Sequence, residues 1–430
     1  MSQWNRRSVA VLGVPFDNVT MCEAIDLIEK KIEESGFHQV ATANVDFVMN
    51  AIYDQGVQEM LCSCDLIVPD GMPIVWASRL IGSRLKERVS GVDLVPRLAE
   101  LAARRDYGIF LLGASETNSR KASEALKQRF PKLRIVGRYS PPVSPLAEMD
   151  HEKILSRIER ARPDILLVAM GHPKQEQWLA MHRHRLRVSL CMGVGASLDF
   201  LAGAVSRAPV WMQTAGLEWL YRAAQEPRRL SQRYLSDAYG LARHLPAQVA
   251  ANAIQPRRTS HPAVQTDRRG SISVISVHGD LSGALLAEFV QELGRVYQED
   301  RHIVLNLAPT GYLGLDSVGF LVQLLKLMQR GDRQLCLAGM PPHISRVFRA
   351  ARMHRFFVST STVSDALYRV RKAEDRLSPE RIVLRPFASP PIDLQMQMEI
   401  LKDLCRRIVS PSETTRPSAN LTGISTVAAR

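Results

Sequence analysis

The chain has 430 residues, of which 46% are hydrophobic and 23% are charged, so we expect a folded protein with two domains. Its formal net charge of +13 indicates an anionic partner, which nucleic acid, an anionic bilayer or a phosphorylated substrate could supply. The sequence has no apolar run of the roughly 18 residues that span a membrane, no signal-peptide pattern and no nucleic-acid-binding motif. We therefore expect a cytoplasmic protein that does not bind nucleic acid.

Residues 1–206 alternate between short apolar runs and amphipathic segments. The apolar runs predict strands, which read VAVLGV, HQVATAN, DLIVPD, YGIFLLGAS, LRIVGRYS, DILLVAMGHP and VSLCMGVGAS in chain order. Amphipathic segments such as SRKASEALKQRF predict the helices between them. This order is typical of an α/β domain with a largely parallel sheet, whose ligands bind at the carboxyl ends of the strands.

The predicted strands stop at residue 207, and residues 207–250 form a basic amphipathic segment. Apolar residues, Trp219 and Tyr234 among them, recur at helical spacing and are surrounded by arginines. A helix of this kind can lie on an anionic bilayer, with its aromatic side chains at the interface. It can equally pack on the sheet and leave its arginines in water, so the pattern alone leaves both interpretations open.

Three segments with different compositions follow. Residues 251–270 are polar and predict an interdomain linker, whereas residues 271–372 repeat the alternation of strands and helices on a smaller scale. We expect this second module to fold separately and to be dispensable for the chemistry of the first. Residues 373–430 are expected to be a partly disordered tail with one helix, IDLQMQMEILKDLCRRIV.

Polar side chains end two of the predicted strands. The run DLIVP is followed by Asp70 and Gly71, a combination that often forms only a turn. The alternative is that Asp70 presents a carboxylate at the edge of the sheet where ligands bind. Thr42 and Asn44 end another predicted strand and are candidate helix caps or ligands.

Other junctions could bind phosphate or a nucleotide. Gly113 in LLGAS ends a strand beside a helix start, where backbone N–H groups can hold phosphate. The segment GHPKQEQW brings a cation, an amide and a carboxylate together in Lys174, Gln175 and Glu176, although it also reads as an ordinary helix start with a proline in the first turn. GVGASL lacks the third glycine of the dinucleotide fingerprint, so a nicotinamide cofactor is not expected.

No residues have the spacing expected of a metal site. The sequence contains no Asp-x-Asp motif and no metal-ligand pattern of cysteine and histidine. Cationic side chains would then have to stabilise any diphosphate leaving group. We expect neither a metal nor another cofactor.

Seven motifs resemble, in order, the WecG/TagA/CpsF family of bacterial glycosyltransferases. They are TAN (42–44), PDG (69–71), RVSGVDL (88–94), LLG (111–113), GHPKQEQW (171–178), GVGASLDFLAG (193–203) and RAPVWMQTAGLEWLYRAAQEPRRLSQRYL (207–235). The resemblance implies a GT-E type α/β domain with a helical membrane-docking appendage. It also implies metal-independent, inverting transfer of an N-acetylmannosamine-type sugar from a UDP donor to an undecaprenyl-diphosphate-linked acceptor, at the inner face of the cell membrane.

The resemblance assigns roles residue by residue. It implies that Asp70 is the general base, that Thr42 and Asn44 contact substrate, and that Arg88 and Gln175 lie near the nucleotide sugar. It further implies that the basic appendage supplies an arginine to the site. The candidates are Arg222, Arg228, Arg229 and Arg233.

The second module resembles a different family. LGLDSVGFL (313–321) and VSDAL (363–367) are similar to STAS domains, named for sulphate transporters and anti-sigma-factor antagonists. The resemblance implies a phosphorylation site at Ser317 and a protein partner; the alternative is that Asp316 and Ser317 only cap a helix. The leading hypothesis for the whole chain is an enzyme of surface polysaccharide synthesis. The alternative is a regulatory protein that binds a nucleotide sugar and uses the STAS-like domain as its output.

Overall fold

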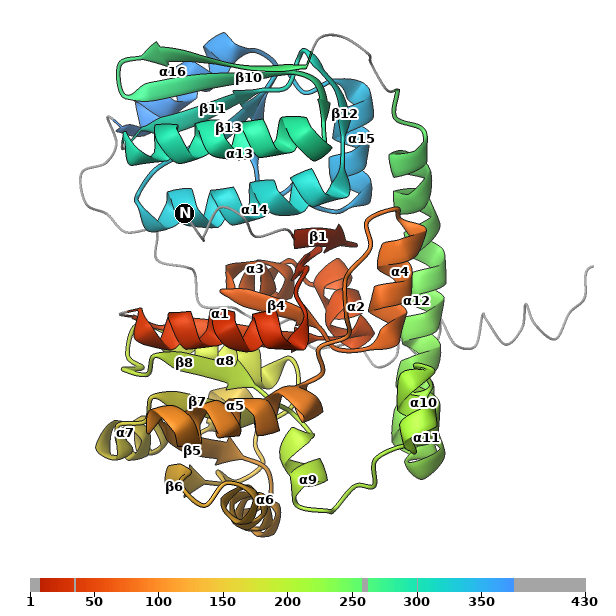
Figure 1. Cartoon of the computed structure of the whole chain (residues 1–430), viewed down its shortest axis with the longest axis vertical. Helices are drawn as coiled ribbons and strands as arrows, with labels where there is room; N and C mark the ends of the chain where they lie inside the picture. The colour runs from red at the N-terminus through yellow and green to blue at the C-terminus, as the bar shows by residue number, and fades with distance from the viewer. Residues whose placement is uncertain (1–7, 35, 257–261, 300, 375–430) are drawn as a thin grey trace, which may run out of the picture. The chain divides into compact units, whose positions relative to one another are not determined.

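The computed structural model describes residues 8–34, 36–256, 262–299 and 301–374, apart from the side chains of residues 228, 229 and 374. Two six-stranded sheets, each covered by helices, make up this part of the chain (Figure 1). We call the first sheet with its helices the N-terminal domain and the second the C-terminal domain. No helix among the described residues combines the length and the apolar character needed to cross a bilayer.

The sheet of the N-terminal domain is entirely parallel and has the order β4-β3-β8-β7-β5-β6. Its strands are β3 (His38–Ala43), β4 (Leu66–Pro69), β5 (Gly108–Gly113), β6 (Arg134–Tyr139), β7 (Ile165–Ala169) and β8 (Leu190–Gly193). All but the edge strand β6 are buried along their whole length, which is why they read as continuous apolar runs. The predicted parallel α/β domain is confirmed.

Helices connect the strands and cover both faces of this sheet. They are α1 (Met21–Glu33), α2 (Val45–Tyr53), α3 (Gln55–Ser63), α4 (Met72–Leu80), α5 (Gly91–Arg105), α6 (Glu116–Arg129), the short 3-10 helix η1 (Leu146–Glu148), α7 (His151–Ala161), α8 (Lys174–His182) and α9 (Ser197–Leu201). Side-chain caps fix several starting points: Thr20 and Glu23 form a capping box at α1, and Ser90 caps α5.

The first predicted strand does not join the parallel sheet. β1 (Ser8–Val11) pairs only with β2 (Val14–Asp17), as an antiparallel hairpin. Its two turn residues, Leu12 and Gly13, both have positive φ, as a tight hairpin turn requires. The Asp17 carboxylate accepts a hydrogen bond from Ile67 N at 2.7 Å and so holds the hairpin beside β4. The prediction of this run as a strand was right, but its place in the sheet was wrong.

The basic segment folds into three helices, α10 (Val210–Thr214), α11 (Glu218–Gln225) and α12 (Pro227–Ala253). We call residues 207–256 the appendage. The predicted linker, 251–270, contains the end of α12 and the whole of β9 (Ala263–Arg269). β9 is a mostly exposed edge strand of polar residues, so no apolar pattern distinguishes it from a linker.

The C-terminal domain has the strand order β12-β10-β11-β13-β14, with β9 antiparallel to β10. Its further strands are β10 (Ile272–Leu281), β11 (His302–Asn306), β12 (Thr310–Leu313), β13 (Leu335–Ala338) and β14 (Val358–Thr360). Its helices are α13 (Gly283–Gln298), α14 (Leu315–Arg330), α15 (Pro342–Ala350) and α16 (Val363–Glu374). The predicted tail helix lies outside the described residues.

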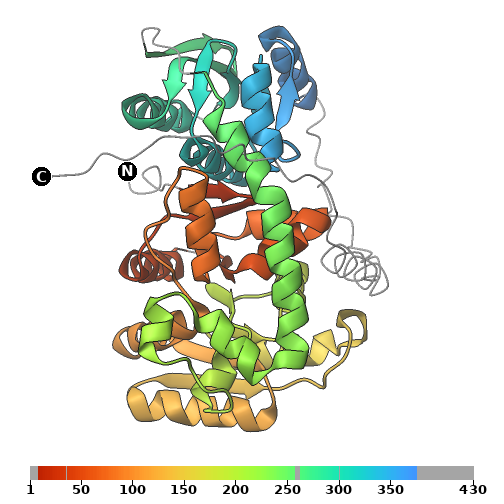
Figure 2. The ribbon, with the colours of Figure 1, turned by 90° about the vertical axis from the view of Figure 1, so that its right-hand side faces the viewer.

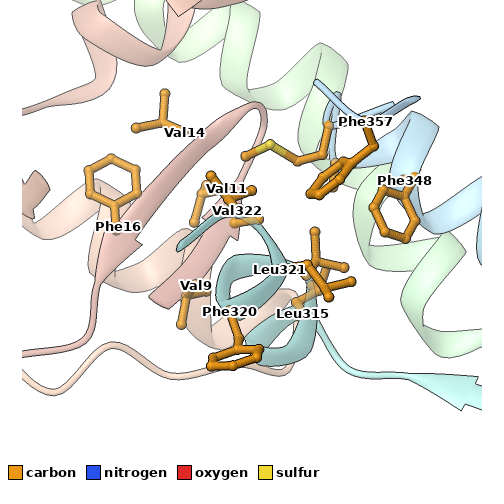
Figure 3. Packing of buried hydrophobic residues seen from close by; sticks show 14 of the residues in the cluster. Val9, Val11, Val14, Phe16, Leu315, Phe320, Leu321, Val322, Phe348 and Phe357 are labelled. Carbon is orange, nitrogen blue, oxygen red and sulfur yellow. The ribbon is translucent and has the colours of Figure 1, made fainter. Parts of the chain in front are cut away.

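The two domains share one hydrophobic core. Val9 and Val11 of the hairpin are packed in the same buried cluster as Phe320 and Val322 of α14 (Figure 3). Gly319 lies so close to the Ser8 carbonyl that a Cβ there would collide with it. Apolar faces of both domains are therefore buried against each other, and separate folding of the second module stays a prediction.

Polar contacts surround this shared core. Gln323 of α14 donates hydrogen bonds to Ser8 and Asp17, at 3.1 and 3.2 Å. Arg330, also on α14, forms an ion pair with Asp65, which precedes β4. Burial favours the protonated form of Asp65, but the hydrogen bond from His38 and the charge of Arg330 hold its pKa well below the usual range. The interface therefore contains an ionised, partnered carboxylate as well as apolar packing.

Candidate active site

A cavity of about 220 Å³ opens at the carboxyl ends of β3 and β4, between the sheet and the appendage. Its wall on the domain side is formed by Asn44, Val45, Asp46, Asp70, Gly71, Met72, Pro73, Arg88, Ser90, Val92 and Phe200. Its wall on the appendage side is formed by Gly216, Glu218, Trp219, Arg222, Arg233, Tyr234, Asp237, Ala238 and Leu241. The ends of the strands in a parallel sheet are where ligands are expected to bind.

Asp70 is placed in this cavity by the end of β4. Its backbone N–H donates to the Ala43 carbonyl at 2.9 Å, which keeps it in register with β3. Gly71 follows with a φ of 140°, a conformation that glycine adopts readily, and lets the chain turn at once into α4. The Asp70 carboxylate thereby lies at the carboxyl edge of the sheet, as the sequence predicted.

The surroundings of Asp70 make its carboxylate a better base. Burial raises its pKa to about 6, while the charges of Arg88 and Arg222 and a hydrogen bond from the Gly91 N–H, 3.4 Å away, oppose that rise. A carboxylate with this pKa is ionised at neutral pH and accepts a proton more readily than an ordinary aspartate. The site therefore contains a group suited to general-base catalysis.

Arg88 connects the domain to the appendage. It donates to Glu218 of α11 at 2.7 Å and to Asp93 of α5 at 3.2 Å. Arg207 approaches the same carboxylates, 2.6 Å from Asp93 and 3.6 Å from Glu218. Sequence reasoning missed Glu218 and Arg207, because it considered only some of the arginines of the appendage and none of its acidic residues.

Two of the four candidate arginines line the cavity. Arg222 lies over the ring of Phe200, 5.2 Å from its centroid, and Arg233 enters from α12. Their Nε atoms are buried and have no hydrogen-bond partner among the described residues. Both guanidinium groups can therefore bind an anion. The side chains of Arg228 and Arg229 lie outside the described part of the structure.

A second carboxylate faces the cavity from the appendage. Asp237 of α12 is only 8% exposed, and burial together with the nearby charge of Asp46 raises its pKa to about 7. Trp219 and Tyr234 lie in an edge-to-face arrangement in the same wall, with their ring centroids 6.1 Å apart. Nothing in the sequence pattern of α12, which begins at Pro227, predicted that Asp237 would face a cavity.

The two residues predicted beside Asp70 differ in their placement. Asn44 lines the cavity and also caps α2, accepting a hydrogen bond from Phe47 N at 3.3 Å. Thr42 is buried, and a Cβ at Gly91 would lie 3.2 Å from its hydroxyl oxygen. Asn44 thus reaches the cavity directly, whereas Thr42 lies beneath the start of α5.

The predicted nucleotide cluster does not line this cavity. Gln175 and Glu176 are buried and hydrogen-bonded to each other at 2.6 Å, and Gln175 also accepts from Gly195 N. Lys174 donates to the carbonyl of Ser144. Gly113 lies tightly against the backbone of β7. Their contribution to substrate binding stays a prediction.

Ser317, the predicted phosphorylation site, is buried at the start of α14. Its hydroxyl donates a hydrogen bond to the Leu281 carbonyl at 2.6 Å, and its N–H donates to Asp316. In this arrangement the hydroxyl is not accessible to a kinase. Phosphorylation of Ser317 stays a prediction, and it would require this part of the domain to open.

A metal site is not found in the part of the chain that the structure describes. No group of three or more histidine, cysteine, aspartate or glutamate side chains there is arranged to hold a metal ion. The cations available to the cavity are its arginines.

Known protein families match both domains. The model of the family described as "Glycosyl transferase WecG/TagA/CpsF family" matches residues 9–254, and the STAS domain model matches residues 263–366. Two solved anti-sigma-factor antagonists, SpoIIAA in its unphosphorylated form and a protein from Mycobacterium paratuberculosis, are 17% and 22% identical to the chain. They cover 26% and 27% of it and 97% and 98% of their own chains, each with a TM-score of 0.24.

Curated relatives match about half of the chain. Proteins of Staphylococcus aureus strains MRSA252 and MW2 are each 32% identical over 230 residues, which is 53% of this chain and 89% of theirs. Both are named N-acetylglucosaminyldiphosphoundecaprenol N-acetyl-beta-D-mannosaminyltransferase. With the family model covering more than half of its length, the chain belongs to the WecG/TagA/CpsF family of glycosyltransferases and carries a C-terminal STAS domain.

Proposed function

We propose that the protein transfers an N-acetylmannosamine-type sugar from a UDP donor to an undecaprenyl-diphosphate-linked acceptor, with inversion and without a metal ion. The observation that carries the proposal is Asp70, a carboxylate with a raised pKa in a cavity that also contains Arg88, Arg222 and Arg233. The names of the curated relatives support the sugar and the lipid-linked acceptor. The proposed location is the inner face of the cell membrane, where such an acceptor would be reached.

The proposed chemistry requires one base and a stabilised leaving group. Asp70 takes the proton from the acceptor hydroxyl as the hydroxyl oxygen forms a bond to the anomeric carbon of the donor. The bond from that carbon to the diphosphate breaks at the same time, and UDP leaves with its electron pair. Arg222 and Arg233 would bind the negative charge that develops on the diphosphate, because their Nε atoms are without partners among the described residues.

The activity can be tested with the purified full-length chain. We expect UDP release that depends on a short-chain diphosphate-linked N-acetylglucosamine acceptor and that persists in the presence of EDTA. Loss of activity on chelation would contradict the metal-independent mechanism. Binding of UDP-sugar without any turnover would contradict the transferase and favour a regulatory protein that reports nucleotide-sugar binding through the STAS domain.

Membrane docking is proposed for the appendage. Val210, Trp211 and Leu220 are 77%, 65% and 48% exposed, and they lie in the two short helices next to the cavity wall. Aromatic and aliphatic side chains beside arginines bind anionic bilayers, at about 1 kcal/mol for each basic residue near the surface. This position would let the lipid-linked acceptor enter the cavity from the bilayer.

Replacing Trp211 with alanine should weaken binding to anionic vesicles several-fold in a co-sedimentation assay, because an interfacial aromatic anchor is lost. The matched control is Tyr368→Ala in α16, since Tyr368 is also 65% exposed but lies in the STAS domain. Equal losses for the two variants, or no loss for Trp211→Ala, would argue against docking through the appendage.

A further inference from the structure

The long helix α12 connects the active-site cavity to the STAS domain. It contacts α2 of the N-terminal domain, at the cavity, and α15 of the STAS domain, and both views of the molecule show it running alongside the two domains (Figures 1 and 2). Its first half contributes Arg233, Tyr234 and Asp237 to the cavity wall. A helix rises about 1.5 Å per residue, so the second half extends some 20 to 30 Å away from these side chains.

Two glutamines, seven residues apart, hold the far end of the appendage. The Gln248 side chain is 1% exposed, and its amide accepts from Leu12 N at 2.9 Å and donates to the Ala10 carbonyl at 2.7 Å. Gln255, just beyond the end of α12, accepts from Leu313 N at 2.9 Å and donates to the Leu313 carbonyl at 3.0 Å. One amide thus binds the backbone of the β1–β2 hairpin and the other binds the backbone of β12 in the STAS domain.

Further contacts reinforce the attachment to the STAS domain. Arg352, which follows α15, lies 3.3 Å from His244 of α12 and 3.4 Å from the carbonyl of Ile52 in α2. Asn252 donates to the Ile81 carbonyl at 2.8 Å. The second half of α12 is therefore clamped between both domains, at sites away from the cavity.

The first half of α12 contacts α2 through Gly240 and α11 through Tyr234, and it has no contact of its own with the STAS domain among those described above. Five of the six residues from Arg233 to Ala238 are exposed or half-exposed, Asp237 being the buried one, and Gly240 allows a close approach to Met49 of α2. Pro246, between the two halves, removes one backbone hydrogen bond from the helix. The orientation of the cavity wall consequently depends on how firmly the second half is held.

We propose that the STAS domain regulates the transferase site by clamping α12 through Gln255, so that docking of the STAS domain sets the position of Arg233 and Asp237. Gln255 is a positioning residue in this proposal, because it acts through the helix and touches no substrate. Any process that separates β12 of the STAS domain from Gln255 would loosen the wall of the cavity. The proposal rests on the proposed function only for its effect on turnover.

Hydrogen exchange of the full-length protein, followed by mass spectrometry, tests the clamp without any substrate. In Gln255→Ala the backbone N–H and C=O of Leu313 lose their partners, and we expect amides in residues 230–241 to exchange about tenfold faster. The exchange rates of the backbone amides in β3 and β8 should be unchanged. Unchanged exchange in residues 230–241 would overturn the proposal.

Two matched variants separate the clamp from general loss of stability. Asn306→Ala removes a side-chain amide that bonds Ser276 at 3.0 Å and Ala308 N at 3.1 Å, both within the STAS domain, and should leave residues 230–241 protected. Gln248→Ala releases α12 from the hairpin and reports what the N-terminal domain contributes by itself. Faster exchange in Asn306→Ala equal to that in Gln255→Ala would overturn the proposal.

Should Gln255→Ala fail to fold, Arg352→Ala offers a milder release, because Arg352 holds α12 through a single side-chain contact with His244. The same criterion applies to it, and protected amides in residues 230–241 would again count against the clamp.

Turnover provides the second readout. If the wall sets substrate binding, Gln255→Ala should raise the KM for donor or acceptor several-fold and change kcat less. If amides in residues 230–241 of Gln255→Ala exchange faster while KM and kcat stay the same, Gln255 holds α12 in place but the proposed regulation of turnover is overturned. Absence of transferase activity in the unaltered protein would instead contradict the proposed function and would leave the exchange result standing.

Discussion

Asp70→Asn is expected to lower the rate of sugar transfer by about 10²–10⁴-fold, the usual contribution of a general base. Asparagine has nearly the same shape and the same preference for turns, and it can keep the hydrogen bonds of the Asp70 backbone with β3. It cannot accept a proton from the acceptor hydroxyl. Affinity for UDP should change little, and turnover close to that of the unaltered protein would contradict the role of Asp70 as the base.

The pH dependence of turnover distinguishes Asp70 from Asp237. The base must be ionised, so kcat/KM should fall about tenfold per pH unit below the Asp70 pKa of about 6. Asp237, with a pKa of about 7, lies in the same cavity and could shape the profile as well. In Asp70→Asn, the residual kcat/KM should no longer fall as the pH drops below about 6. If the fall persists, it must come from the titration of another group.

The raised pKa also predicts the effect of Asp70→Asn on stability. The native state binds the Asp70 proton more tightly than the unfolded chain, whose aspartate has its ordinary pKa of 3.8. As pH rises from about 4 to about 6, the Asp70 carboxyl ionises in the unfolded state but stays largely protonated in the native state. The free energy of unfolding therefore falls over this range of pH. Asp70→Asn should raise the Tm at neutral pH, while Asp106→Asn, at an exposed residue beyond the end of α5, should not.

Much of the N-terminal domain could be predicted because its strands are buried on both faces. A strand of this kind reads as a short apolar run, and a polar residue after it marks the carboxyl end of the sheet. Asp70 and Asn44 were found in this way, and both line the cavity. The position of the hairpin could not be found, because the run from Ser8 to Val11 is as apolar as a strand in the sheet.

The contacts that complete the site depend on residues far apart in the sequence. Arg88 and Glu218 are separated by 130 residues, and nothing in the local pattern of either predicts their hydrogen bond. Gln175 shows the limit of this approach, because its polar triplet at a strand end suggests a ligand, whereas the structure buries the side chain and pairs it with Gly195, so that its role in binding stays a prediction. Local pattern identifies which residues are polar at an edge, whereas only the fold decides which of them face a cavity.

Removal of the STAS domain is expected to destabilise the transferase severely. A chain ending at residue 256 would expose the faces of Val9 and Val11 that pack against α14, and it would leave Asp17 and Asp65 without Gln323 and Arg330. Burying an aliphatic side chain contributes about 1.5–3 kcal/mol, so these two valines alone amount to roughly 3–6 kcal/mol. That loss is comparable to the whole stability of a typical domain, about 5–15 kcal/mol.

Thermal unfolding of the truncated chain, with Gly319→Ala in the full-length protein beside it, would measure this dependence. The truncated chain should aggregate or melt far below the full-length protein. Gly319→Ala keeps both domains but forces its new Cβ against the Ser8 carbonyl, and it should cost about 1–3 kcal/mol by displacing α14 from the hairpin. A truncated chain with an unchanged melting temperature would show that the hairpin is stable by itself.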